Sequence, residues 1–280
     1  MHGGARFQTP VVIDAEVEGE IADLALIAPL HNTPALKALD QARQALPAAP
    51  HVAVFDTAFH ATIPDEAAVY AVPARWREEW GIRRFGFHGL SVQWSAERVR
   101  APRLVVCHLG GGCSVTAVRD GRSVDTSMGF SPLEGVPMAS RSGSVDPGIL
   151  LFLLRERFLT LDELDRALEH ESGLEALGGL DTELGLSVYT HRIAAAVAGM
   201  ASALGGLDAL VFTAGVGENV PAVRAEVCRR LEFLGIELDA RANESAQPDA
   251  EISTPGSSVR VAVIRAREEV VVARAVRALV

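Results

Sequence analysis

Lysine is almost absent from this chain, although arginine is common. Of 26 basic residues only Lys37 is a lysine, and it stands outside any glycine-rich context. The phosphate-binding loop G-x-x-x-x-G-K-[ST] requires a lysine directly after its second glycine. The sequence therefore excludes a nucleotide site of that kind. A guanidinium is expected to do any phosphate binding that needs a cation.

Net positive charge and long apolar runs are lacking as well. The formal net charge of −10 at pH 7 argues against non-specific binding to nucleic acid or to an anionic membrane. No apolar run approaches the ~20 residues of a membrane-spanning helix. The first residues have neither the basic flank nor the apolar stretch of a signal peptide. We predict a cytoplasmic protein.

Cysteine is scarce and irregularly spaced. Cys107 and Cys113 flank a glycine run, and Cys228 falls within a helical pattern. This spacing does not match that of known zinc or redox motifs. We interpret the three residues as buried, reduced thiols.

What the chain does contain is an alternation of short apolar runs and amphipathic stretches. The apolar runs predict buried strands, and the amphipathic stretches predict helices. Strands that alternate with helices favour an α/β fold. The strands are expected at residues 52–55, 104–107, 209–212 and 261–264, and the helices at 21–28, 33–45, 91–100, 146–158, 161–170, 190–204, 221–234 and 268–279.

Two of these strands run into glycine-rich turns, at residues 104–112 and 210–217. Glycines at a strand end let backbone N–H groups approach an anion closely, as a phosphate site requires. The first segment continues into a second apolar stretch followed by Asp120–Gly121, which predicts a β-hairpin turn. Glycine turns are also common as plain connections, so the two loops alone leave binding and structural interpretations open.

Seven short motifs make the sequence specific. They are HGG at residues 2–4, APLHN at 28–32, VFDTAFH at 54–60, FGFHG at 85–89, DTSMGFSPLEG at 125–135, RSG at 141–143 and FTAGVGEN at 212–219. In this order they resemble the acetate kinase family, within the sugar-kinase, heat-shock-70 and actin superfamily. The resemblance covers the full length of the chain.

The resemblance implies an ATP-dependent phosphotransferase with a carboxylate acceptor. Its catalytic residues would be Asp56, His88, Arg141 and His31, and Glu268 would hold Mg²⁺. Bringing two anions together requires positioning and charge neutralisation, which suits an arginine and a metal-holding carboxylate. The structural alternatives are a helix cap or turn for Asp56 and a packed imidazole for His88.

The nucleotide, ATP or ADP, would lie against both glycine loops. The residues implied are His108, Leu109, Gly110, Gly111, Gly112, Gly215, Val216, Gly217, Glu218 and Asn219. An apolar pocket of Leu30, Phe87 and Pro132 would take the acyl chain. Such a pocket separates acids of neighbouring length by only ~1 kcal/mol per methylene, so acetate, propionate and butyrate stay open.

The sequence also departs from the family pattern. Arg267 and Gly111 replace two asparagines, and the adenine segment near residues 177–184 is short and has no arginine. An Asn-x-Gly-Ser-Ser-Ser turn and an arginine that precede HGG in the family have no counterpart, so we expect an N-terminally truncated chain. A catalytically degenerate relative is therefore a third interpretation.

The implied architecture is α/β with duplicated ribonuclease-H-like domains, as in actin-like ATPases, and with the N-terminal domain incomplete. Residues 1–58 would be the remnant of that domain, joined by the helix at 269–280. Residues 59–268 would form the C-terminal, nucleotide-binding domain. The resemblance also implies a homodimer and no nucleic-acid or membrane partner.

Overall fold

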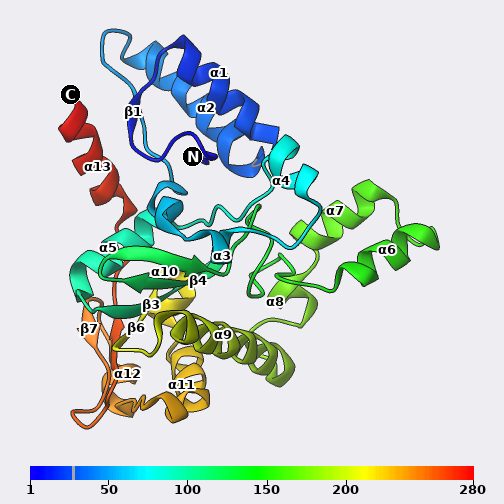
Figure 1. The fold of residues 1–280 in the computed structure, drawn as a ribbon. Coiled ribbons are helices and arrows are strands. Elements are labelled where there is room, and N and C mark those ends of the chain that lie inside the picture. Colours follow the sequence, from blue (N-terminus) through cyan, green and yellow to red (C-terminus); the bar gives the residue numbers. More distant parts are fainter. Residues whose placement is uncertain (27–28) are drawn as a thin grey trace.

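The computed structural model describes the backbone of residues 1–26 and 29–280, and the side chains of residues 1–25 and 32–280. Its centre is a six-stranded sheet in the order β5-β4-β3-β6-β8-β7 (Figure 1). The strands are β3 (Arg103–Leu109), β4 (Cys113–Arg119), β5 (Arg122–Thr126), β6 (Ala209–Thr213), β7 (Ala250–Glu251) and β8 (Arg260–Val263).

Neighbouring strands β3, β6 and β8 are parallel, whereas β4, β5 and β7 are added antiparallel. The β4–β5 connection is the turn predicted from sequence, because Arg119 pairs with Arg122 across Asp120 and Gly121. Both turn residues have positive φ, 49° and 80°. These values are typical of a type I′ turn, whose twist matches the flanking strands.

Helices cover both faces of this sheet (Figure 1). On one face α9 (Glu183–Leu204) and α11 (Pro221–Arg230) bury a large core around Val105, Leu210 and Ile193. On the other face α5 (Gly89–Val99) and α13 (Glu268–Leu279) bury a smaller core around Val106 and Val211. The strands are apolar on both faces because helices cover both.

The N-terminal segment forms a separate small layer. Its strands β1 (Val11–Val12) and β2 (Val52–Ala53) make a two-stranded antiparallel sheet, packed by α1 (Ala15–Asp23), η1 (Leu24–Leu26) and α2 (Pro29–Ala45). The strand predicted at 52–55 is therefore shorter. Phe55 is buried by stacking on Phe7, with ring centroids 4.7 Å apart, and not by strand pairing.

The C-terminal helix α13 packs against α5, where Arg274 pairs with Glu97 at 2.8 Å and Val271 enters the core. A cavity of about 350 Å³ lies between α13, α5 and residues Val54 and Phe55 of the N-terminal layer. The division into residues 1–58 with 269–280, and 59–268, stays a prediction.

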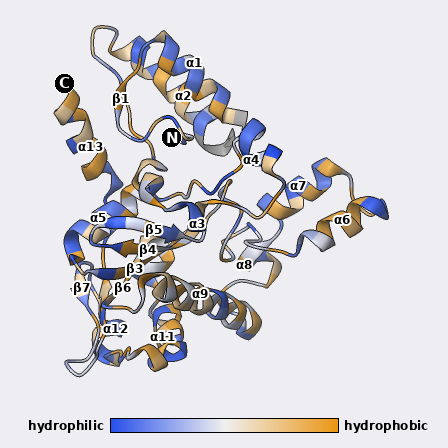
Figure 2. Ribbon diagram, in the orientation of Figure 1, coloured by the Kyte–Doolittle hydropathy of each residue, from blue (hydrophilic) through white to orange (hydrophobic). Residues whose placement is uncertain are grey.

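Two helices project from the body as an arm (Figure 1). They are α6 (Pro147–Arg155) and α7 (Leu161–His170), followed by α8 (Gly173–Ala176) at its base. Among the described residues α6 buries no side chain, although it is strongly apolar (Figure 2). The remaining short elements are η2 (Ala58–Thr62), α3 (Asp65–Ala68), α4 (Ala74–Trp80), α10 (Ala214–Asn219), η3 (Glu232–Leu234) and α12 (Ala240–Glu244).

Candidate active site

The two glycine loops predicted to hold nucleotide meet at one edge of the sheet. His108 of β3 pairs with Thr213 of β6, so these parallel strands end side by side. A Cβ built on Gly110 would lie 3.5 Å from the Cβ of Ala214 and 3.7 Å from the backbone nitrogen of Gly215. The sequence prediction of two phosphate-type loops therefore corresponds to one continuous glycine-lined surface.

Beside this surface two histidines stack on each other. The rings of His88 and His108 are 4.0 Å apart between centroids and inclined by 18°. Ser114 Oγ lies 3.0 Å from His88 Nδ1, and Ser91 Oγ lies 2.8 Å from His108 Nδ1. Burial and the neighbouring His88 lower the pKa of His108 well below its usual value, which keeps the His108 ring neutral.

Asp56 follows strand β2 and joins the N-terminal end of α5. Its Oδ2 accepts a hydrogen bond from the backbone N–H of His88 at 2.5 Å, and its Oδ1 accepts from that of Leu90 at 3.3 Å. The helix-cap interpretation weighed from sequence is thus present in the structure. The hydrogen bond from the His88 N–H to Asp56 therefore caps the start of α5 and also holds the backbone of a predicted site residue.

The backbone around His88 is specialised for this position. His88 has φ of 60°, a left-handed conformation that is uncommon outside glycine. Gly89 donates its N–H to the carbonyl of Asp56 at 2.9 Å, and a Cβ at Gly89 would collide with that oxygen. Glycine at residue 89 is therefore required for the close approach of α5 to Asp56.

Arg141 approaches the same surface from the arm side. Its Nη1 donates to the carbonyl of Pro132 at 2.9 Å. A Cβ built on Gly112 would lie 3.0 Å from Arg141 Nη2 and 3.0 Å from His88 Nε2. The guanidinium and the imidazole thus flank one point above the first glycine loop, where they can both donate to a single oxyanion.

A second arginine holds the segment that carries Pro132. Arg84 Nη1 donates to the carbonyls of Thr126, Ser127 and Met128 at 3.0, 3.1 and 3.0 Å. Its Nη2 pairs with Glu134 at 2.8 Å, and Tyr70 donates to the other oxygen of that carboxylate. Burial raises the pKa of Tyr70, so its hydroxyl stays a donor.

Sequence reasoning missed this supporting set. Arg84, Tyr70, Ser91 and Ser114 were not singled out, because their roles depend on contacts between distant segments. One signal was available for Ser114. An apolar stretch that follows a glycine turn directly can pair with the strand before it, and here the pairing of β3 with β4 places Ser114 opposite His108.

Glu268 is the first residue of α13 and lies near Asp56. Burial, then the charges of Asp56 and Glu269, raise the pKa of Glu268 to about 7, and the Met1 amino group opposes this. A carboxyl group whose pKa is raised by a neighbouring carboxylate gains from a cation between the two. No cluster of three or more His, Cys, Asp or Glu suited to a metal occurs among the described residues.

The second loop differs in detail from the prediction. Residues 214–219 form helix α10 directly after β6, so the turn expected before the helix at Pro221 is itself helical. Glu218 Oε1 accepts from the N–H of Ala214 at 3.0 Å and of Ala266 at 2.8 Å. Asn219 Nδ2 donates to the carbonyl of Gly215 at 2.8 Å. Both side chains therefore have bonds within the protein, and their contact with a nucleotide stays a prediction.

Two of the residues predicted for the acyl pocket, Phe87 and Pro132, have described side chains. Phe87 is buried in the main core, 1% exposed, with its ring 5.4 Å from that of His2. Pro132 is buried as well and contributes its carbonyl to Arg141. The side chains of Leu30 and His31, the other predicted site residues of this region, lie outside the described residues.

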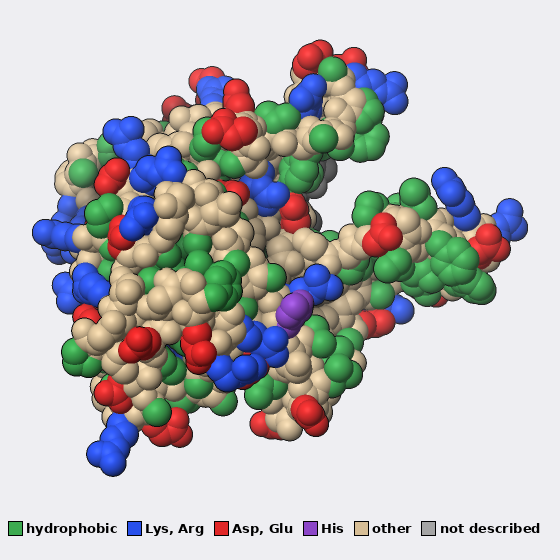
Figure 3. Space-filling view, turned by 60° about the horizontal axis from the view of Figure 1, so that its bottom comes forward, with side chains coloured by type: hydrophobic (Ala, Val, Ile, Leu, Met, Phe, Trp, Pro, Cys, Tyr) green, Lys and Arg blue, Asp and Glu red, His purple; other side chains and the backbone are tan. Residues whose placement is uncertain are grey.

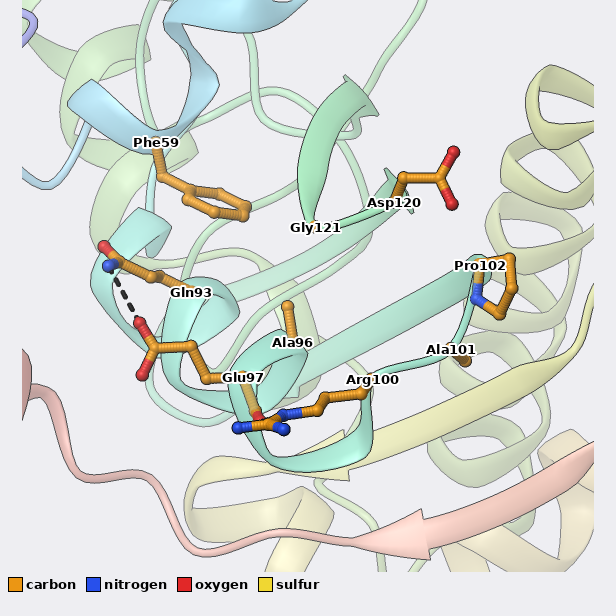
Figure 4. Close-up of a pocket in the computed structure, with 9 residues that line it drawn as sticks. All are labelled: Phe59, Gln93, Ala96, Glu97, Arg100, Ala101, Pro102, Asp120 and Gly121. Carbon is orange, nitrogen blue, oxygen red and sulfur yellow. Dashed lines mark hydrogen bonds between the residues drawn. The ribbon is translucent and has the colours of Figure 1, made fainter.

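A cavity of about 640 Å³ lies elsewhere, between α5 and the β4–β5 turn (Figure 4). Phe59, Ala96 and Pro102 contribute its apolar wall. Gln93 is hydrogen-bonded to Glu97, which also pairs with Arg274. None of the predicted site residues lines this cavity.

No described helix has both the length and the apolar character to cross a bilayer.

Comparisons with known proteins identify the family of this chain. The sequence model of the Acetokinase family matches residues 1–274. Acetate kinases from Protochlamydia amoebophila and Gloeobacter violaceus are 43% and 46% identical, and each alignment covers 98% of this chain and 74% of the relative.

Solved structures extend the comparison to the fold. An acetate kinase from Porphyromonas gingivalis superposes with a TM-score of 0.91 at 34% identity, covering 100% of this chain and 76% of that one. A propionate kinase from Francisella tularensis gives 0.91 at 34%, covering 98% and 76%. The mixed α/β architecture is that of these kinases and is consistent with an actin-like ATPase fold. The chain belongs to the acetokinase family.

Proposed function

We propose that this chain transfers the γ-phosphoryl group of ATP to acetate, reversibly, giving acetyl phosphate and ADP. One carboxylate oxygen of acetate forms a bond to the γ-phosphorus. The bond from that phosphorus to the β–γ bridging oxygen breaks, and its electron pair leaves with ADP. The observation that carries the proposal is the convergence of Arg141 and His88 on one point beside the joined ends of β3 and β6.

The described residues have distinct tasks in this reaction. Arg141, held by the carbonyl of Pro132, stabilises the negative charge on the oxygens of the transferred phosphoryl group. His88 donates from Nε2 to the same group while Ser114 fixes its ring. Asp56 fixes the backbone of His88, and the glycine loop Gly110–Gly112 lets the nucleotide phosphates approach the backbone.

Magnesium suits the pair formed by Asp56 and Glu268. Mg²⁺ binds proteins through one or two carboxylates and completes its shell with water and substrate phosphates. Burial is the main cause of the raised pKa of Glu268, and the charge of Asp56, the second cause, is what such an ion would offset. When bound, the ion would neutralise phosphate charge. A Mg²⁺-dependent rise in Tm at pH 8 that is lost in Glu268→Gln is the expected result, and an equal rise in both proteins would contradict it.

The test of the activity is formation of acyl phosphate by the purified chain with ATP, Mg²⁺ and acetate, trapped as the hydroxamate. Propionate and butyrate serve as competing acids, and acetate is expected to give the highest kcat/KM. Product that disappears in Arg141→Ala supports the proposal. A folded chain that binds ATP without making product would instead identify a degenerate relative.

We also propose a homodimer, formed through the arm. Ile149, Phe152 and Phe158 are 51%, 54% and 63% exposed, and hydrophobic side chains gather on this projection (Figure 3). An exposed apolar patch marks an interaction surface, and a two-fold interface joins the same patch on two copies of a chain. Light scattering is expected to show a dimer that Phe152→Glu converts to monomer. Phe233→Glu, an exposed aromatic on the body, is the matched control that leaves the dimer intact.

A further inference from the structure

The largest fully buried side chain of the described residues is a cation that the proposed reaction does not use. Arg224 of α11 is 1% exposed. Among the described residues no carboxylate lies within ion-pair distance of its guanidinium. Burial lowers the pKa of Arg224, and Cys228 and Glu244 only partly oppose this effect. Burying a charge without an opposite charge costs free energy, so hydrogen bonds are expected to offset the cost for this guanidinium.

Four hydrogen bonds join this guanidinium to carbonyl oxygens. Nη1 donates to the carbonyls of Gly217 and Glu218, at 3.0 and 2.9 Å. Nε and Nη2 donate to the side-chain and main-chain carbonyls of Asn243, both at 2.7 Å. Asn243 is itself buried and donates back to the carbonyl of Pro221 at 3.0 Å.

Two of these acceptors belong to the last turn of α10. The terminal carbonyls of a helix have no partner within the helix and carry partial negative charge, so a cation there is stabilising. At the opposite end, Glu218 accepts from the N–H of Ala214, whose φ is 66°. The short helix is therefore fixed at both ends by charged groups, Arg224 and Glu218.

The fixed helix is the one that faces the first glycine loop. Ala214 and Gly215 lie against Gly110, and Glu218 also holds Ala266, two residues before Glu268. A helix of six residues has little stability of its own. A shift of α10 would therefore move the nucleotide surface and the segment that leads to the proposed metal carboxylate.

We propose that Arg224 is a positioning residue that holds α10 in place for nucleotide binding. The inference rests on the proposed function for the identity of the ligand, but not for the anchoring of α10. Lysine at this position could not reach all four acceptors. The donors of an ammonium group sit on one atom, whereas those of a guanidinium are spread over a plane.

The experiment compares Arg224→Gln, Arg224→Lys and the matched control Arg229→Gln. Arg229 lies on the same helix, is exposed and forms an ion pair with Glu226. Hydrogen–deuterium exchange is measured on the amides of residues 214–219 without nucleotide. Faster exchange by about tenfold in Arg224→Gln, an intermediate rate in Arg224→Lys and no change in the control are expected.

Kinetics supply the second measurement. KM for ATP is expected to rise about tenfold in Arg224→Gln, with KM for acetate within twofold of the parent protein, whereas loss of folded protein would lower only the apparent kcat. If Arg224→Gln does not fold, Asn243→Ala removes one partner of the guanidinium and is measured in its place.

Unchanged exchange in residues 214–219, or equal increases in both KM values, would overturn the assignment of Arg224. A parent chain that binds no ATP would overturn the proposed function instead. The exchange measurement would still decide the role of Arg224 in that case.

Discussion

A methyl group added at Gly112 tests whether Arg141 and His88 work at the same point. The Cβ of Gly112→Ala would lie 3.0 Å from Arg141 Nη2, 3.0 Å from His88 Nε2 and 3.2 Å from His88 Cε1. Gly112 is not among the residues with positive φ, so the backbone accepts alanine without strain. The substitution therefore changes the space between the two side chains and little else.

The size of the effect follows from the distances. Ordinary contacts between carbon and its neighbours begin at ~3.5 Å, so one or both side chains must move by about 0.5 Å. A misplacement of ~1 Å in a site of this kind costs up to ~100-fold in rate. We expect kcat to fall by about 10- to 100-fold, with a change in unfolding free energy below ~1 kcal/mol.

Gly19→Ala is the control. It makes the same chemical change in helix α1, outside the proposed nucleotide surface, and its Cβ meets no atom within 4 Å. Acyl hydroxamate formation and thermal melting are measured for both variants. Equal activity in the two would show that Arg141 and His88 do not share a reacting group, and the proposed mechanism would be refuted.

Three further results are expected. The pKa of Glu268 is raised from 4.5 to about 7 by folding. Between these pH values the folded state therefore holds a proton that the unfolded state has lost. The unfolding free energy should therefore fall as pH rises from about 4.5 to 7, by ~1–2 kcal/mol after solvent screening, and urea titrations of Glu268→Gln should show less of this fall. Ser114→Ala, which leaves His88 Nδ1 without its hydroxyl, should lower kcat about tenfold, whereas Ser91→Ala should have a smaller effect. If Asp56 acts through the backbone of His88, the kcat/KM losses in Asp56→Asn and His88→Ala should be less than additive in the double variant.

Features encoded by local sequence could be predicted well. The turn at Asp120–Gly121 was predicted correctly, because residue conformation and strand periodicity determine it locally. The helices at 161–170 and 268–279 begin and end as predicted. Thr160 and Glu163 form a capping box at the start of the first, a signal that lies within four residues.

Features that depend on distant segments could not be predicted. The buried run at 52–55 suggested a full strand, but among the described residues the ladder of β2 with β1 contains two pairs, at Val52 and Ala53, so β2 contains two residues. The acceptors of Arg224 come from α10 and α12, and no local pattern connects them. Helix α9 begins at Glu183 instead of 190, because Thr182 caps it upstream of the apolar stretch.

The role of Asp56 shows why fold and chemistry are difficult to separate in this site. Sequence offered a helix cap and a reacting carboxylate as alternatives, yet the cap bonds are what place His88 beside Gly112. The charge of Asp56 also reaches Glu268 and His108, so it acts on groups along the site. A substitution of Asp56 would therefore disturb both the start of α5 and the electrostatics of the site. The short motif around Asp56 is therefore explained by helix capping, backbone approach and electrostatics together.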